Sequence, residues 1–324
     1  MTIARGWRTA RDVKGPFPIR RDDLAELNDV FSDSFSDRYR RDGMVGVRVP
    51  HLNPLVWRYA MDDAGAGAML WRDERNAIAG FNIAHMSGVE GWMGPLAVRP
   101  DMQGIGLGRI VVQSGVEWLK EQGATVIGLE TMPRTMDNIG FYSTLGFDPQ
   151  RLTITLVVTA LGQVRPARLL GRLTPAARDA TMVAITELTR RVRPGYDFAR
   201  EIEITDSLSL GDTVLLERDG SLVGFALCHS VPLVEGRSRD ELRVLKLVLQ
   251  EEEDMHEMMS AVADFARRSG TRAASVRVQG EYPDAYRQLV NGGARVRWTD
   301  LRMTLAGYAE SRPERGMLLS NWEI

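Results

Sequence analysis

The sequence predicts an α+β fold that occurs twice along the chain. The 324 residues exceed the size of one ordinary domain and suit two. Both halves show the same order of elements: a helix, a β-hairpin, a strand, a helix, a strand, a helix and a final strand. We therefore expect a tandem of two domains, residues 1–160 and 161–324, each a mixed, mostly antiparallel sheet flanked by helices.

The first half begins with an amphipathic helix over 22–35, where apolar residues recur at helical spacing behind an acidic first turn. A hairpin follows, since two apolar strands flank the polar turn 73–76. The later elements are set by apolar runs and by glycines at helix ends. We predict strands over 68–71, 78–85, 92–98, 124–130 and 147–158, and helices over 107–122 and 137–145.

The second half repeats this order after a segment near residues 160–173, where glycine and proline interrupt the periodicity. Pro175 suits the first turn of a helix, and Asp219-Gly220 is a strong hairpin signal. The second strands of the two hairpins also match, Ile78-Ala79-Gly80-Phe81 against Leu222-Val223-Gly224-Phe225. The predicted helices are 174–191, 251–268 and 283–290, and the strands are 213–217, 222–228, 243–249, 274–278 and 296–305.

Composition excludes several classes of function. A net charge of −2 argues against nucleic-acid binding, which usually needs a basic domain. Cys228 is the single cysteine, so the chain can form no internal disulfide or thiolate cluster, and the four histidines lack metal-binding spacing. No signal peptide or membrane-spanning run is evident, so we expect a cytoplasmic protein without a bound metal.

The chemistry concentrates in the glycine loop Q-G-I-G-L-G, Gln103 to Gly108, between a strand and a helix. Backbone N–H groups of such a loop can converge on a pyrophosphate, and the helix dipole favours the negative charge. Gly106 and Gly108 would let the phosphates approach the backbone, and Arg109 could add a contact at the rim. A dinucleotide loop would need a third glycine at Arg109, and a P-loop would need a following Lys-Ser or Lys-Thr.

Two motifs together resemble the GNAT superfamily of N-acetyltransferases. Residues 96–109, L-A-V-R-P-D-M-Q-G-I-G-L-G-R, are similar to its coenzyme-binding signature, and residues 141–147, F-Y-S-T-L-G-F, are similar to its second signature. The resemblance implies acetyl-CoA as co-substrate. The coenzyme-binding residues that it implies are Leu96, Ala97, Val98, Gln103, Gly104, Ile105, Gly106, Leu107, Gly108, Arg109, Asn138 and Tyr142.

The resemblance also implies catalytic roles. The backbone N–H of Val98 would polarise the thioester carbonyl, and the phenol of Tyr142 would protonate the departing sulfur, unless Tyr142 serves only to pack the core. Glu90, on the strand before the loop, is the first candidate for the general base. His85, Asp62 and a water relay are the alternatives. The family often has an asparagine where this chain has Thr135, and an alanine where it has Asn138, so the coenzyme contact of that asparagine is not carried over.

The second half lacks a comparable loop. Its matching position reads Gln250-Glu251-Glu252-Glu253-Asp254, four carboxylates that would repel a pyrophosphate, although such a run is also typical of a solvated helix start. We expect a degenerate copy that completes the fold and walls the acceptor site of the first half. The predicted function is acetyl-CoA-dependent acetylation of an amine, by a monomer or homodimer, and the alternative is a non-catalytic coenzyme-binding sensor or scaffold. The sequence does not identify the amine.

Overall fold

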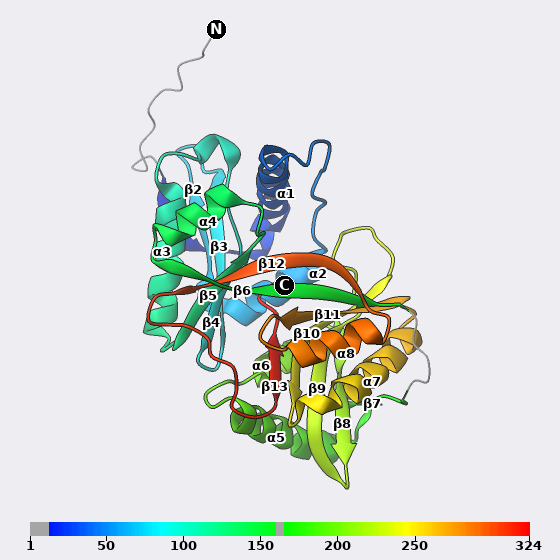
Figure 1. The fold of residues 1–324 in the computed structure, drawn as a ribbon. Coiled ribbons are helices and arrows are strands. Elements are labelled where there is room, and N and C mark those ends of the chain that lie inside the picture. The colour runs from blue at the N-terminus through cyan, green and yellow to red at the C-terminus, as the bar shows by residue number, and fades with distance from the viewer. Residues whose placement is uncertain (1–12, 160–164) are drawn as a thin grey trace.

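The computed structural model describes residues 13–159 and 165–324, and it confirms the predicted fold class. Helices flank a mixed, mostly antiparallel sheet in each half (Figure 1). The strands of the first half are β1 (Lys14–Pro18), β2 (Ala68–Arg72), β3 (Ile78–Ser87), β4 (Glu90–Val98), β5 (Val126–Thr131) and β6 (Phe147–Val158). Its helices are α1 (Leu24–Arg41), α2 (Pro54–Ala64), α3 (Leu107–Glu121) and α4 (Met136–Ser143).

The second half has the same order of elements. Its strands are β7 (Arg168–Leu169), β8 (Gly211–Arg218), β9 (Ser221–His229), β10 (Glu241–Leu249), β11 (Ala273–Gln279), β12 (Arg295–Leu305) and β13 (Met317–Ser320). Its helices are α5 (Pro175–Val192), α6 (Ala199–Ser207), α7 (Met255–Arg268) and α8 (Pro283–Asn291). Five of these elements were not predicted from the sequence: β1, α2, β7, α6 and β13. The predicted start of α7 at Glu251 is wrong by four residues, because Glu252–Asp254 form a separate 3-10 turn.

The two halves exchange their last long strands. Strand β12 of the second half lies between β5 and β6, and β6 of the first half pairs antiparallel with β11. Figure 1 shows both strands crossing the middle of the molecule. The two sheets therefore join into one 13-stranded sheet among the described residues. The sequence boundary between the halves, partly inside the undescribed residues 160–164, does not coincide with a boundary in space.

Each half contains a parallel strand pair that opens towards its carboxyl end. In the first half β4 pairs with β5 only over Glu90–Met93, and in the second half β10 pairs with β11 only over Glu241–Arg243. The two openings differ in what occupies them. Strand β13 pairs antiparallel with the Lys246–Leu249 part of β10 and fills the second opening, whereas none of the described strands pairs with the Gly94–Val98 part of β4 on this side.

A buried ionic cluster joins the halves behind the β4–β5 pair. The ammonium of Lys246 on β10 lies 3.8 Å from Glu90 Oε2 and 3.9 Å from Glu201 Oε1, and it donates to Ser320 Oγ at 2.8 Å. Burial raises the pKa of Glu90, and burial together with Asp63 raises the pKa of Glu201 to about 7. Lys246 is thus the cation that balances two buried carboxyl groups from different parts of the chain.

We expect Lys246→Met to lower the free energy of unfolding by roughly 3 to 5 kcal/mol, because it leaves buried carboxyl groups without their cation. Chemical denaturation would measure the change. Lys14→Met is the matched control, since Lys14 is exposed on β1 and its replacement should cost less than about 0.5 kcal/mol. Equal stability of the two variants would show that the cluster does not hold the halves together.

Candidate functional site

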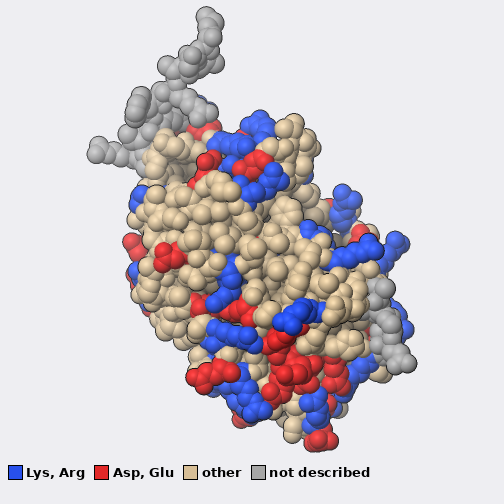
Figure 2. All heavy atoms as spheres, in the orientation of Figure 1, with Lys and Arg blue, Asp and Glu red and all other residues tan. Residues whose placement is uncertain are grey.

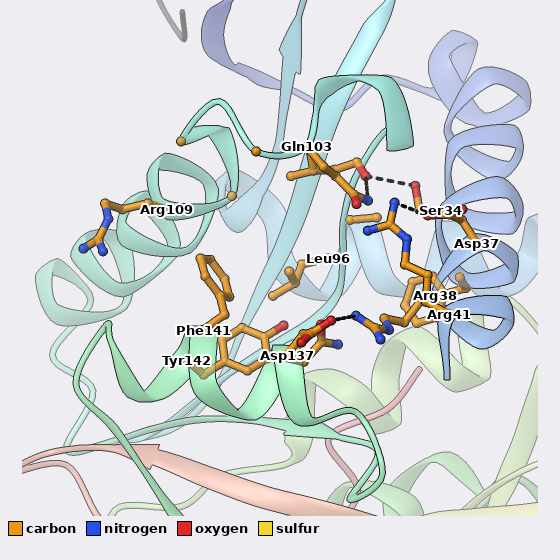
Figure 3. Close-up of a pocket in the computed structure, with 17 residues that line it drawn as sticks. Ser34, Asp37, Arg38, Arg41, Leu96, Gln103, Arg109, Asp137, Phe141 and Tyr142 are labelled. Atoms are coloured by element: carbon orange, nitrogen blue, oxygen red, sulfur yellow. Dashed lines mark hydrogen bonds and ion pairs between the residues drawn. The ribbon is translucent and has the colours of Figure 1, made fainter. Parts of the chain in front are cut away.

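The opening beside β4 contains a cavity of about 540 Å³, here called the outer pocket. Strand β4, the glycine loop, α4 and the α1 helix surround it, and Figure 3 shows their side chains. Ten of the twelve predicted coenzyme residues line it: Leu96, Ala97, Val98, Gln103, Gly104, Gly106, Gly108, Arg109, Asn138 and Tyr142. Ile105 and Leu107 do not, because both pack into the apolar cluster between α3 and the sheet. The structure therefore brings most of the predicted set to one cavity.

The glycine loop presents free backbone donors to this pocket. Gly104 and Gly106 adopt positive φ angles of 81° and 89°, which turn the chain directly into α3. In the described part of the chain, the backbone N–H groups of Gly106, Leu107 and Gly108, at the start of α3, donate no hydrogen bond. A β-carbon on Gly108 would lie 3.3 Å from Phe141 Cζ, so the loop also packs closely against α4. This arrangement is that of an anion site at a helix N-terminus.

The edge of β4 is open along the same pocket. The Arg99 N–H donates to the Ala79 carbonyl, so Val98 and Gly80 form a pair whose own backbone groups do not bond to each other. The N–H and C=O of Val98 therefore point away from β3. The Val98 carbonyl accepts from Gln103 Nε2 at 2.9 Å and from Ser34 Oγ at 3.2 Å (Figure 3). Residues two apart on a strand direct their backbone N–H and C=O groups to the same side, so the backbone groups of Leu96 also point away from β3.

Tyr142 lies where the outer pocket meets a second cavity. Its side chain is 7% exposed, and Figure 3 shows its phenol directed towards Leu96. Burial alone raises its pKa, so the hydroxyl stays protonated at neutral pH. The hydroxyl makes no hydrogen bond to any described residue. Within residues 13–159 and 165–324 it is therefore a proton donor without a partner.

The second cavity, here called the inner pocket, has a volume of about 340 Å³ and lies between the two halves. It shares five residues with the outer pocket: Phe35, Arg38, Leu96, Asn138 and Tyr142. Its other walls come from the carboxyl ends of β4 and β5, from β12 and from the last residues of the chain. The two cavities are thus adjacent, with Leu96 and Tyr142 in the wall that both share.

None of the proposed bases lines either pocket. Glu90 is fully buried and accepts from Ser320 Oγ at 2.7 Å and from Trp322 Nε1 at 2.8 Å. His85 is also buried, with its Nδ1 2.5 Å from Asp63 Oδ2 and its ring stacked on Trp92. Asp62 lies on α2 beside Arg58. The geometry therefore does not support a base role for Glu90, and its contacts are those of a structural group between the halves.

Three carboxylates that sequence reasoning did not select line the inner pocket: Glu130, Asp300 and Glu323. Glu130 ends a predicted strand but gave no signal of its own beyond its position. Asp300 belongs to the second half in sequence, and only the strand exchange carries it to the first half. No sequence pattern could have placed it there.

Comparisons with known proteins agree with this geometry. Residues 25–147 match the model of the acetyltransferase (GNAT) family. The chain is a tandem GNAT-fold protein. A putative acetyltransferase from Pyrococcus horikoshii has a similar structure, with a TM-score of 0.68, 14% identity, and coverage of 96% of this chain and 95% of that one. No curated protein matches the chain in sequence.

Two further structures also match over both halves. A tandem GNAT protein from the clavulanic acid biosynthesis pathway matches with a TM-score of 0.59 and 13% identity, over 92% of this chain and 99% of that one. N-myristoyltransferase from Saccharomyces cerevisiae, solved with bound myristoyl-CoA, matches with a TM-score of 0.60 and 10% identity, over 94% and 87%. These likenesses show a shared fold.

Three further observations concern the surface, the helices and the potential metal ligands. Figure 2 shows basic and acidic side chains intermixed on this face of the molecule, most densely over the second half. Within residues 13–159 and 165–324, no helix is both long and apolar enough to cross a membrane. No group of three or more potential metal-ligating side chains occurs in these same ranges.

Proposed function

We propose that this protein transfers the acetyl group of acetyl-CoA to a primary amine. One observation carries the proposal: a glycine loop at a helix N-terminus, an open strand edge and a phenol that bonds to no described residue line one cavity, and a second cavity adjoins it. The loop suits the coenzyme pyrophosphate, the strand edge suits the amides of its pantetheine arm, and the phenol lies where the thioester would end. The myristoyl-CoA complex of a structural relative supports the use of an acyl-CoA.

The second half offers an internal precedent for a ligand on the β4 edge. There, β13 lies antiparallel on the Lys246–Leu249 part of β10, at the place that corresponds to the open part of β4. An extended chain carrying amide groups can therefore be held in such an opening by backbone hydrogen bonds. Since the second opening is already filled, we propose that the coenzyme binds only to the domain formed largely by residues 1–160, and that residues 161–324 form a degenerate copy.

The proposed transfer begins with a neutral amine, formed when the bound ammonium loses a proton. The amine nitrogen attacks the thioester carbonyl carbon, and a backbone N–H of β4 stabilises the negative charge that develops on the carbonyl oxygen. We assigned this role to Val98 from the sequence. Leu96 now fits better, because its N–H faces the same side and Leu96, unlike Val98, lines both pockets.

The carbon–sulfur bond then breaks as the carbon–nitrogen bond is completed. Tyr142 gives its proton to the departing sulfur, and the nitrogen loses its surplus proton to yield a neutral amide. The phenol is reprotonated, so the balance is one ammonium and one acetyl-CoA giving one amide, one thiol and one released proton. Tyr142 suits this step because burial keeps it protonated.

Release of coenzyme A thiol from acetyl-CoA, followed with a panel of amines, tests the proposal. We expect thiol release that depends on both an amine and the protein, with the acetylated amine as product. Tight acetyl-CoA binding without turnover on any amine would contradict the transferase and leave the non-catalytic sensor.

A further inference from the structure

The inner pocket is closed on one side by apolar and aromatic walls from both halves of the molecule. Phe35 and Tyr39 come from α1, and Trp298 comes from the exchanged strand β12. The rings of Tyr39 and Trp298 lie 6.5 Å apart, between their centroids. Further apolar walls are provided by Val49, Leu52, Pro95, Leu129, Leu233 and Ile324. A cavity with these walls suits the carbon skeleton of a small molecule.

The other side of the inner pocket is acidic. Glu130, Asp300 and Glu323 line it, and all three depend on the single guanidinium of Arg277, at 2.5, 3.0 and 2.6 Å. Glu130 has a second cation in Arg302, at 2.9 Å, but Arg302 also pairs with Glu310. Four carboxylates thus share two arginines.

The remaining basic group of the pocket is already engaged. Arg38 pairs with Asp42 and with Asp137, on the side of the outer pocket. Arg243 donates to the Ile324 carbonyl at 3.0 Å and acts on Glu323, but it also acts on Glu241. The carboxylates around the inner pocket therefore outnumber the arginines that they share, and a bound cation would balance the excess.

Asp300 and Glu323 are the carboxylates with capacity for that cation. Arg277 and Arg302 hold the pKa of Glu130 at about 2 against the effect of burial, so this carboxylate is fully paired. Burial and the neighbouring Glu323 raise the pKa of Asp300 to about 7, although Arg277 opposes them. Trp298 Nε1 donates to Asp300 Oδ1 at 3.1 Å and orients it. The Glu323 side chain is about half exposed.

We propose that the inner pocket binds the acceptor as a small ammonium ion with an apolar or aromatic body, its charge held by Asp300 and Glu323 and its body lying against Tyr39 and Trp298. The claim that this ammonium ion is the acetyl acceptor rests on the proposed function. The claim that the pocket binds such an ion does not. It assigns the acceptor site to both halves, since Asp300, Glu323 and Trp298 belong to the second half in sequence. It disfavours acidic acceptors, and acceptors that are long polyamines without an apolar body.

Calorimetry without acetyl-CoA tests the binding, with three probes. 2-Phenylethylamine carries the predicted charge and body, 3-phenylpropionate carries a similar body with the opposite charge, and spermidine carries charge without an apolar body. We expect 2-phenylethylamine to bind at least tenfold more tightly than either of the others. Equal or tighter binding of 3-phenylpropionate or of spermidine would overturn the proposal.

Asp300→Asn should weaken the binding of 2-phenylethylamine at least tenfold and leave acetyl-CoA binding unchanged. Asp148→Asn is the matched control, because Asp148 is an exposed carboxylate on the neighbouring strand β6 and lines neither pocket. Unchanged amine affinity in a folded Asp300→Asn protein would contradict the assignment. If Asp300→Asn does not fold, two other variants provide the test, Glu323→Gln and Trp298→Ala, because both side chains are partly exposed. Each of them must then weaken the binding of 2-phenylethylamine.

The pH dependence of turnover gives a second readout. Asp300 faces Arg277, Glu130, Glu323, Trp298 and, across the pocket, Tyr39. Because its folded pKa is about 7, the carboxylate is protonated below this value and ionised above it. We expect kcat/KM for 2-phenylethylamine to rise with pH through about 7, and this limb to disappear in Asp300→Asn.

The binding and turnover results separate the two proposals. Amine binding with the predicted selectivity, but no thiol release, would reject the transferase and retain the acceptor site. Thiol release with spermidine or with an acidic amine, but not with 2-phenylethylamine, would retain the transferase and reject the acceptor class.

Discussion

Replacing Tyr142 with phenylalanine should lower kcat about a hundredfold or more and leave acetyl-CoA affinity within about threefold of the original. The phenol is the buried, protonated donor at the junction of the two pockets, and it bonds to no described residue. Without this hydroxyl the departing thiolate receives no proton from residue 142, and no hydrogen bond to a described residue is broken. Steady-state kinetics by thiol release, with calorimetry for the coenzyme, would measure both effects.

Tyr59→Phe provides the control for this substitution. Tyr59 is as buried as Tyr142 but packs edge-on against His229, away from both pockets. We expect it to leave kcat unchanged. If Tyr142→Phe and Tyr59→Phe had the same kcat as the original protein, Tyr142 would be a core residue and another group would protonate the sulfur.

Gly106→Glu should weaken acetyl-CoA binding on the order of a hundredfold, because it sets a carboxylate against the pyrophosphate at the start of α3. The substitution also strains the backbone, since Gly106 has a φ of 89°. Calorimetric titration would measure the affinity, and thermal unfolding would measure the strain.

Gly123→Glu separates charge from strain. Gly123 has a φ of 83° at the other end of α3, and the space around its missing β-carbon is equally open. Both variants should lose similar stability, but only Gly106→Glu should lose the coenzyme. Full coenzyme binding by Gly106→Glu would refute the anion-binding role of the loop.

The sequence predicted the local features of the site well, because they depend on short segments. The glycine loop, the strand before it and the helix with Tyr142 are encoded within about fifty residues. Their residue types fix a turn, a free strand edge and a buried phenol. The side chains of Ile105 and Leu107 enter the core, so a coenzyme contact of these two residues stays a prediction for their backbone groups alone.

The features that depend on the arrangement of the two halves could not be predicted. Each half has a complete set of strands in sequence, so nothing in the periodicity indicates that β6 and β12 change places. Without this exchange Asp300 and Trp298 have no reason to lie near Tyr142. Glu90 was selected for its place before the glycine loop, but the approach of Lys246, Ser320 and Trp322 from the second half buries it.

Calorimetric titration of the intact chain with acetyl-CoA tests the central claim most directly. We propose one coenzyme site, in the open β4 edge and the glycine loop of the first half, because the corresponding opening of the second half is filled by β13. We predict a stoichiometry of one acetyl-CoA per chain, with the site lost in Gly106→Glu. No binding, or two sites per chain, would contradict the account.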